Sequence, residues 1–161
     1  MMVPGNQSGE KLMNTFLNPS LVAKEEKEIK EKAEEVIEFL NLSHLSNELA
    51  GNLSGGQKKL LELGRTMMVE AKLVLLDEVG AGVNRTLLKD LGTAIQKLNE
   101  EKGYTFCMIE HDMDFIGRLC NPVIVMAEGS VLFEGSVDEA KKDEKVIESY
   151  LGRGSKLKDK N

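Results

Sequence analysis

The most constraining feature of this 161-residue chain is a pair of short apolar runs separated by one amphipathic helix. The first run, residues 73–76, ends at two acidic residues, and the second, residues 104–109, ends at Glu110. Such runs are typical of strands that are buried on both faces of a sheet. Between them, apolar residues over 87–98 recur at helical spacing, and Gly103 marks the helix end. Strand, helix and strand predict a βαβ unit with parallel strands and a right-handed crossover.

The rest of the chain is expected to divide into segments of different character. Residues 1–20 contain prolines and glycines without a sustained period and are predicted to be a loop leading in. Residues 21–70 are predicted to form a helical subdomain, with a charged, solvated face over 24–32. Residues 71–152 form the α/β part, and the lysine-rich residues 153–161 are expected to be a disordered tail.

Within the α/β part, three further elements are expected after the βαβ unit. A helix is predicted near residues 112–119. The apolar segments 123–126 and 131–133 flank Glu128-Gly129 and predict a hairpin. Ser136, with Glu139 three residues later, fits a capping box that opens a last helical stretch.

Composition narrows the classes of function. The chain carries 27 acidic against 21 basic residues, a net charge of −6, which argues against a protein that binds the nucleic-acid backbone. Two cysteines, Cys107 and Cys120, imply no disulfide framework and suit a reducing cytosol. No stretch approaches the ~20 apolar residues that span a bilayer. We therefore expect a globular protein of the cytosol without a nucleic-acid partner.

Polar residues follow both predicted strands. Asp77 and Glu78 end the first apolar run, and His111 follows the second. In a parallel α/β sheet, ligands bind outside the carboxyl ends of the strands. Two acids there suit phosphoryl chemistry, in which one holds Mg²⁺ and the other orients a water, while a histidine contacts phosphate or carries protons. The alternative is that the acids start a polar loop and His111 helps to cap a helix.

A second candidate site lies at the start of the helix that precedes the first strand. Ser54 and Gln57 fit a capping box, which does not explain the glycines between them. Each glycine costs about 1 kcal/mol relative to alanine inside a helix. Gly55 and Gly56 are favourable if backbone N–H groups must approach a ligand closely, and a helix N-terminus suits phosphate.

The order of these motifs carries a resemblance to a known family. Leu-Ser-Gly-Gly-Gln at 53–57 is followed by the strand and two acids at 73–78, Ala-Gly-Val-Asn at 81–84, and His111. This order resembles the ATP-binding-cassette ATPases, with their signature motif, Walker B strand, D-loop and switch histidine. The resemblance implies an α/β fold, namely part of a P-loop NTPase-type parallel sheet with an α-helical signature subdomain. It also implies ATP and Mg²⁺ as cofactors.

The resemblance assigns a role to each candidate residue. Contacts with nucleotide fall to the signature motif and the D-loop: Ser54, Gly55, Gly56, Gln57 and Asn84. Asp77 would bind Mg²⁺ through water, Glu78 would polarise the attacking water, and His111 would contact the γ-phosphate. In the family, two cassettes pair head to tail, so the signature of one reaches the γ-phosphate that the partner's P-loop holds.

Within the family, the chain looks most similar to ATP-binding subunits of bacterial branched-chain amino-acid importers. The residues behind this narrower resemblance include Ile-Glu-His-Asp-Met at 109–113 and Val-Ile-Glu-Ser-Tyr-Leu-Gly at 146–152. The implied partners are a second cassette and integral membrane permease subunits, and the implied location is the inner face of the cell membrane. The transported substrate is not determined by the motifs.

The chain departs from the family pattern in two ways. No P-loop is present, since Gly51 and Gly56 have the right separation but Gln57 stands where lysine is required. Val79 stands where the family usually has proline after the acid. The first departure predicts the C-terminal portion of a longer cassette that is inactive alone, with exposed apolar surface around residues 73–76 and a tendency to aggregate.

Two alternatives stay open from the sequence. The chain could be a non-catalytic half-cassette that acts only as an interaction module, for which a Glu78→Gln variant would behave as wild type. It could also derive from a cassette ATPase with another substrate, including the DNA-repair type. The short helical region and the acidic charge speak against that last class.

Overall fold

The computed structural model describes residues 7–10, 12–69 and 71–151. The chain divides into two compact units, Met1–Cys107 and Met108–Asn161, which are described separately. The expected division at residue 70 into a helical and an α/β segment stays a prediction, and the predicted tail, 153–161, lies outside the described residues. Among the described helices, none combines the length and apolar character that a bilayer span requires.

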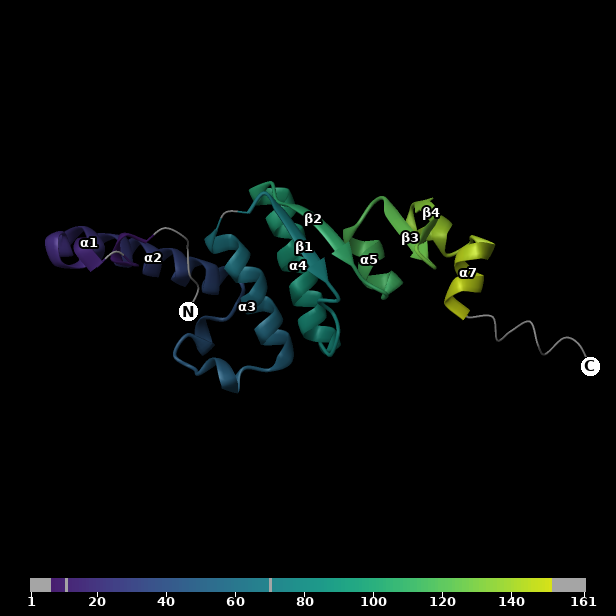
Figure 1. The fold of residues 1–161 in the computed structure, drawn as a ribbon. Coiled ribbons are helices and arrows are strands. Elements are labelled where there is room, and N and C mark those ends of the chain that lie inside the picture. Colours follow the sequence, from purple (N-terminus) through teal and green to yellow (C-terminus); the bar gives the residue numbers. More distant parts are fainter. Residues whose placement is uncertain (1–6, 11, 70, 152–161) are drawn as a thin grey trace, which may run out of the picture. The chain divides into compact units, whose positions relative to one another are not determined.

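The first unit begins with helices where the composition predicted a loop (Figure 1). A 3-10 turn, η1 (Ser8–Glu10), precedes α1 (Leu12–Leu17) and α2 (Pro19–Phe39). The prediction of a loop over residues 1–20 was therefore wrong for α1 and for the start of α2. Proline marked the segment as irregular, but Pro19 occupies the first turn of α2, where its missing N–H costs nothing.

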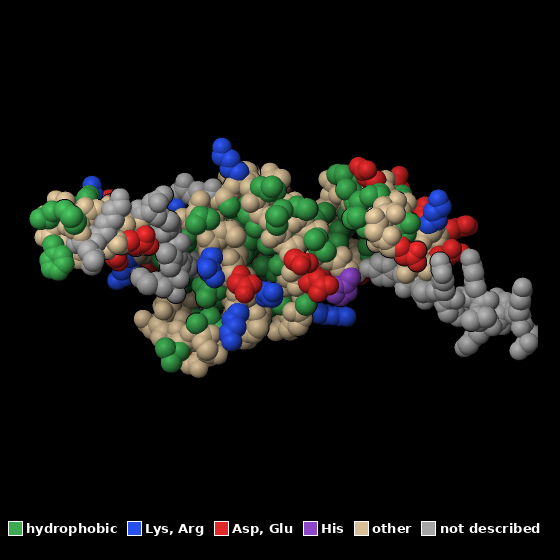
Figure 2. All heavy atoms as spheres, viewed as in Figure 1, with side chains coloured by type: hydrophobic (Ala, Val, Ile, Leu, Met, Phe, Trp, Pro, Cys, Tyr) green, Lys and Arg blue, Asp and Glu red, His purple; other side chains and the backbone are tan. Residues whose placement is uncertain are grey.

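Helix α1 leaves an apolar surface exposed. Its side chains Met13, Phe16 and Leu17 are mostly exposed, and Figure 2 shows hydrophobic atoms gathered at this end of the chain. Helix α2 carries the charged face that the sequence predicted. Its exposed lysines pair with glutamates one turn later, as in Lys27–Glu31 at 3.7 Å.

The predicted βαβ arrangement follows α2, and its last two residues, Met108 and Ile109, belong to the second unit. Two 3-10 turns, η2 (Ser43–Leu45) and η3 (Ala50–Asn52), lead into α3 (Gly55–Met68), which is followed by β1 (Leu73–Asp77), α4 (Arg85–Lys102) and β2 (Thr105–Ile109). Strands β1 and β2 pair in a small parallel sheet (Figure 1). Helix α4 ends at Gly103, whose φ of 70° is the left-handed conformation that glycine adopts without strain.

Strand β1 is buried on one face only, in contrast to the expectation of burial on both. Val74 and Leu76 are buried, whereas Leu73 and Leu75 are 57% and 72% exposed. Ile109 on β2 is 63% exposed. A continuous apolar run is typical of a strand that is covered on both faces, but the described residues cover β1 on one face only. The predicted exposed apolar surface around 73–76 is confirmed (Figure 2).

The second unit is a hairpin packed on short helices. Helix α5 (Met113–Leu119) leads to β3 (Val123–Ala127) and β4 (Ser130–Gly135), which pair antiparallel and turn at Glu128-Gly129 as predicted. Helices α6 (Val137–Ala140) and α7 (Glu144–Leu151) follow. The predicted capping box at Ser136 is present, and a small core forms around Val123, Val137 and Ala140.

Candidate functional site

The N-terminus of α3 is organised by a reciprocal cap. Ser54 Oγ accepts a hydrogen bond from the Gln57 backbone N–H at 3.3 Å, and Gln57 Oε1 accepts one from the Ser54 backbone N–H at 2.8 Å. The predicted capping box is therefore confirmed. It holds both side chains against the backbone of the first turn and so fixes the direction in which α3 begins.

The two glycines of this turn have different environments. A Cβ atom added to Gly55 would have the Gly82 carbonyl oxygen, at 3.9 Å, as its nearest neighbour, so the space beside Gly55 is open. A Cβ added to Gly56 would lie 2.6 Å from Leu87 Cδ1, 2.9 Å from Leu87 Cβ and 3.1 Å from Val83 Cγ1. Gly55 therefore leaves room for a ligand, whereas Gly56 is required by the packing of α3 on the start of α4.

The acids at the end of β1 are both exposed, while Val79 after them is buried. Glu78 has a φ of 45°, in the left-handed region that non-glycine residues rarely adopt. Two backbone hydrogen bonds tighten the following loop, from Ala81 N–H to the Glu78 carbonyl and from Val83 N–H to the Gly80 carbonyl, each at 3.1 Å. The loop thus returns the chain directly from β1 to α4.

Asn84 caps α4 at the end of this loop. Its side-chain oxygen accepts a hydrogen bond from the Leu87 backbone N–H at 2.9 Å. The structure therefore gives Asn84 a helix-capping role that the sequence analysis did not assign, beside the predicted contact with nucleotide. The cap also places Leu87, which the sequence marked only as an apolar helix residue, against Gly56.

These contacts join two of the predicted motifs within one chain. The signature turn at 54–57 and the loop at 78–84 meet through Gly56, Val83 and Leu87. Sequence spacing could not reveal this contact, because Gly56 and Leu87 are far apart in sequence. A signal was present nonetheless, since a glycine in the first turn of a helix is explained by close packing as well as by a ligand.

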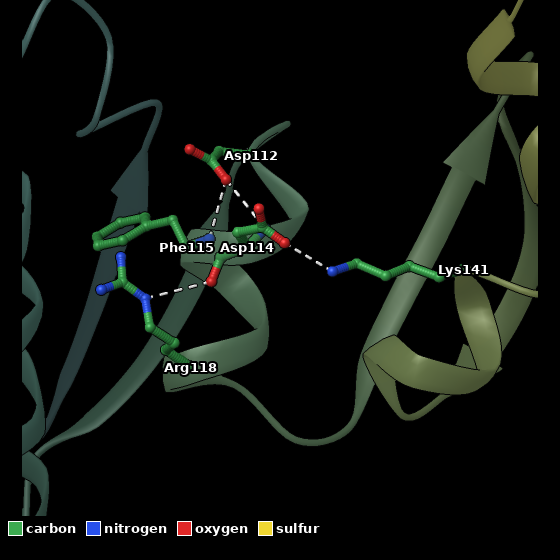
Figure 3. A network of polar contacts seen from close by, with 5 residues as sticks. All are labelled: Asp112, Asp114, Phe115, Arg118 and Lys141. Carbon is green, nitrogen blue, oxygen red and sulfur yellow. Dashed lines mark hydrogen bonds and ion pairs between the residues drawn. The ribbon is translucent and has the colours of Figure 1, made fainter. Parts of the chain in front are cut away.

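His111 belongs to the second unit, where it is exposed and directly precedes the cap of α5. Asp112 Oδ1 accepts hydrogen bonds from the backbone N–H groups of Asp114 and Phe115, both at 2.9 Å (Figure 3). The predicted action of His111 and Glu78 on one phosphate concerns residues of two separate units and stays a prediction. Within its own unit, the α5 cap determines where the chain after His111 turns into the helix.

An ion pair ties α5 to the residue that follows α6. Lys141 Nζ donates to Asp114 Oδ1 at 2.6 Å (Figure 3). The hydrogen bond from Lys141, with its positive charge, lowers the pKa of Asp114, and the same hydrogen bond raises the pKa of Lys141. Because both groups are exposed, we expect a local rather than a global effect on stability.

Replacement of Lys141 by methionine is expected to raise the pKa of Asp114 toward its ordinary value. In the native protein the pKa of Asp114 is below its unfolded value. The pair therefore stabilises the fold above the unfolded value, and this contribution is lost as pH falls through the folded pKa. Carbon-detected NMR titration of the Asp114 carboxyl group measures the shift. Lys142→Met is the control, and an unchanged Asp114 midpoint in Lys141→Met would contradict the assignment.

Asp77, the last residue of β1, is the carboxylate that the sequence predicts to hold Mg²⁺. Among the described residues, no group of three or more histidine, cysteine, aspartate or glutamate side chains is placed to hold a metal ion. Asp77 alone fits the donor set that Mg²⁺ uses when it arrives with a nucleotide, namely one or two carboxylates together with phosphate oxygens and water. A single carboxylate of this kind therefore fits a metal that arrives with ATP.

Comparisons with known proteins find related sequences over most of the chain. A sequence profile described as "ABC transporter" matches residues 7–81. A probable branched-chain amino acid transport ATP-binding protein of Archaeoglobus fulgidus is 45% identical over 129 residues, covering 80% of this chain and 50% of the relative. A methionine import ATP-binding protein of Staphylococcus aureus is 34% identical over 122 residues, covering 75% and 36%.

Solved structures show the same likeness. The ADP conformation of an ATP-binding cassette of an ABC transporter superimposes with a TM-score of 0.72 at 40% identity, covering 78% of this chain and 51% of that one. The chain spans about half the length of the first curated relatives that it matches. By this profile match, the identity to curated relatives and the likeness of fold, the chain belongs to the ABC transporter family of ATP-binding proteins.

Proposed function

We propose that this chain supplies the signature side of a composite ATP site and closes on ATP that is held by the P-loop of a second cassette. The observation that carries the proposal is the open N-terminus of α3. Gly55 has free space beside it, and Ser54 and Gln57 are fixed by their reciprocal cap. A helix start of this kind presents N–H groups and a positive dipole end, which favour a terminal phosphate.

The remaining site residues would act on the same phosphate. Glu78 would orient and polarise the attacking water, and His111 would contact the γ-phosphate. Asp77 would hold Mg²⁺ through water, and the ion would neutralise charge on the β- and γ-phosphates. Gly56 and Asn84 would hold these groups in place. Gly56 allows α3 to pack closely on α4, and Asn84 caps the start of α4.

The complete assembly is proposed to energise import of branched-chain amino acids. This proposal is supported by the 45% identity to the Archaeoglobus fulgidus protein, which exceeds the 34% identity to the methionine import protein. The partners would be a second cassette, in a head-to-tail dimer, and permease subunits in the membrane. The chain would act in the cytoplasm, peripherally on the inner face of the cell membrane.

A second candidate is a non-catalytic interaction module. Its support is the sequence itself, in which no glycine-rich loop is followed by the Lys-Ser or Lys-Thr pair of a P-loop. Such a module would use the α3 N-terminus to bind a complete cassette without contributing Glu78 to hydrolysis. A Glu78→Gln variant with wild-type behaviour in the mixed assembly would favour this candidate over the first.

We expect the chain to bind a fluorescent ATP analogue weakly or not at all by itself, and to associate with a P-loop-bearing cassette only when MgATP is present. Gly55→Glu should abolish this association, because a carboxylate would occupy the place of the phosphate while the open site tolerates the side chain. Gly51→Glu is the matched control, since its surroundings are also open and it lies outside α3.

Sedimentation of the labelled chain with the cassette, with and without MgATP, measures the association. Equal loss in both glutamate variants would indicate a general charge effect and would contradict the proposal. Tight binding of ATP to the chain alone, abolished by Asp77→Ala, would show that other residues cradle the phosphates.

A further inference from the structure

Leu87 lies outside every motif of the candidate site, yet it contacts the turn at 54–57. Helices α3 and α4 pack against each other (Figure 1), and Leu87 stands in the first turn of α4. A Cβ added to Gly56 would lie 2.6 Å from Leu87 Cδ1 and 2.9 Å from Leu87 Cβ. The backbone of α3 therefore approaches the Leu87 side chain more closely than any other residue at position 56 would allow.

The position of Leu87 is itself fixed by the start of α4. The side-chain oxygen of Asn84 accepts a hydrogen bond from Leu87 N–H, and the Asn84 carbonyl oxygen accepts one from Leu88 N–H, both at 2.9 Å. One turn later, Leu91 is only 2% exposed and anchors α4 in the core. The Leu87 side chain therefore projects from a backbone that is held on both sides, and it can act as a rigid support.

The hydrogen bonds of the turn at 54–57 determine its shape but not its place. The reciprocal cap joins Ser54 to Gln57, and both of its hydrogen bonds are closed within the turn. Such bonds move together with the turn when the start of α3 shifts. The contact of Gly56 with Leu87 reaches outside α3, so it fixes the turn relative to α4.

We infer that Leu87 is a positioning residue for the proposed phosphate-binding turn: by packing against Gly56, it sets where the N–H groups of the turn stand. This role rests on the proposed function and deepens it, because it names a residue outside the motifs on which the geometry of the site depends. A displacement of about 1 Å is enough to impair a site of this kind. Truncation of Leu87 removes the support but none of the groups proposed to contact phosphate.

The first measurement is MgATP-dependent association of the full chain with a P-loop-bearing cassette, by the sedimentation experiment described above. Leu87→Ala should weaken this association at least about fivefold, since the first turn of α3 loses its support. Leu87→Met should associate as the wild type does, because methionine has a similar volume and reaches the same contact. Leu91→Val is the control for stability: it shortens a buried side chain one turn later and should leave association unaltered.

The second measurement needs no partner and reports on the turn directly. Steady-state ¹⁵N–{¹H} NOE values measure backbone order on the picosecond to nanosecond timescale. In the full chain without a partner, Leu87→Ala should lower these values for residues 55–57, whereas Leu87→Met and Leu91→Val should leave them unchanged. A general loss of stability does not produce a change confined to these three residues.

Unchanged association in Leu87→Ala would overturn the inference, whether or not the turn becomes less ordered. Equal weakening of association by Leu87→Ala and Leu91→Val would also overturn it, since the effect would then come from stability alone. A wild-type chain that fails to associate would instead contradict the proposed function. In that case the NOE comparison would still decide whether Leu87 positions the turn, and unchanged NOE values would show that it does not.

Discussion

Gly56→Ala is expected to lower the free energy of unfolding by about 1–2 kcal/mol, whereas Gly55→Ala leaves it unchanged or raises it slightly. Alanine favours a helix over glycine by up to about 1 kcal/mol, and this gain applies to both positions. At Gly56, however, the new Cβ would lie 2.6 Å from Leu87 Cδ1 and 2.9 Å from Leu87 Cβ. Overpacking of this kind costs about 1–3 kcal/mol, which outweighs the gain in helix propensity from glycine to alanine.

Urea unfolding followed by far-ultraviolet circular dichroism measures both variants at low protein concentration. For a chain of this length, 1 kcal/mol corresponds to a shift in Tm of roughly 2–4 °C. In a Leu87→Ala background the cost of Gly56→Ala should fall, because the contact with Cδ1 is gone while the contact with Cβ remains. Equal effects at the two glycines, or no coupling to Leu87, would contradict the packing role of Gly56.

The second large effect is expected at the exposed face of the β1–β2 sheet. Leu73, Leu75 and Ile109 are each more than half exposed, and each large aliphatic side chain gains about 1.5–3 kcal/mol when it is fully buried. The isolated chain should therefore self-associate as its concentration rises. Leu75→Lys should weaken self-association at least about tenfold, since a charge cannot be buried in such a contact without a large penalty.

Sedimentation velocity over a range of concentrations measures this change. Thr93→Lys, at an exposed position of α4, adds the same charge away from the sheet and should leave self-association unaltered. A wild-type chain that stays monomeric and melts cooperatively above ~60 °C would show that the exposed sheet face causes neither self-association nor loss of stability.

Local signals accounted for much of what could be predicted from the sequence. The capping boxes at Ser54 and Ser136, the left-handed end of α4 at Gly103 and the hairpin at Glu128-Gly129 each depend on a few neighbouring residues. The hydrogen bonds that stabilise these features join residues within one turn, so the features can be predicted from neighbouring residues alone. The order of these elements also predicted the α/β fold class, which the similarity to solved cassettes confirms.

What escaped prediction depends on residues that are distant in the chain. The close approach of Gly56 to Leu87 requires knowledge of how α3 packs on α4. The apolar run at 73–76 by itself indicates burial on both faces, so the exposure of Leu75 was predicted only from the departure from the family pattern and not from its own segment. Helix α1 was missed since six residues are too few for a period to stand out.

The left-handed backbone at Glu78 has a consequence for engineering. A glutamate with a φ of 45° holds a conformation that glycine or asparagine adopts at lower cost, by about 1 kcal/mol. A library selected only for yield or heat resistance would therefore enrich those two residues at position 78. Either substitution would remove the carboxylate that the proposed hydrolysis of ATP needs. Selection for stability and selection for activity would therefore favour different residues at position 78.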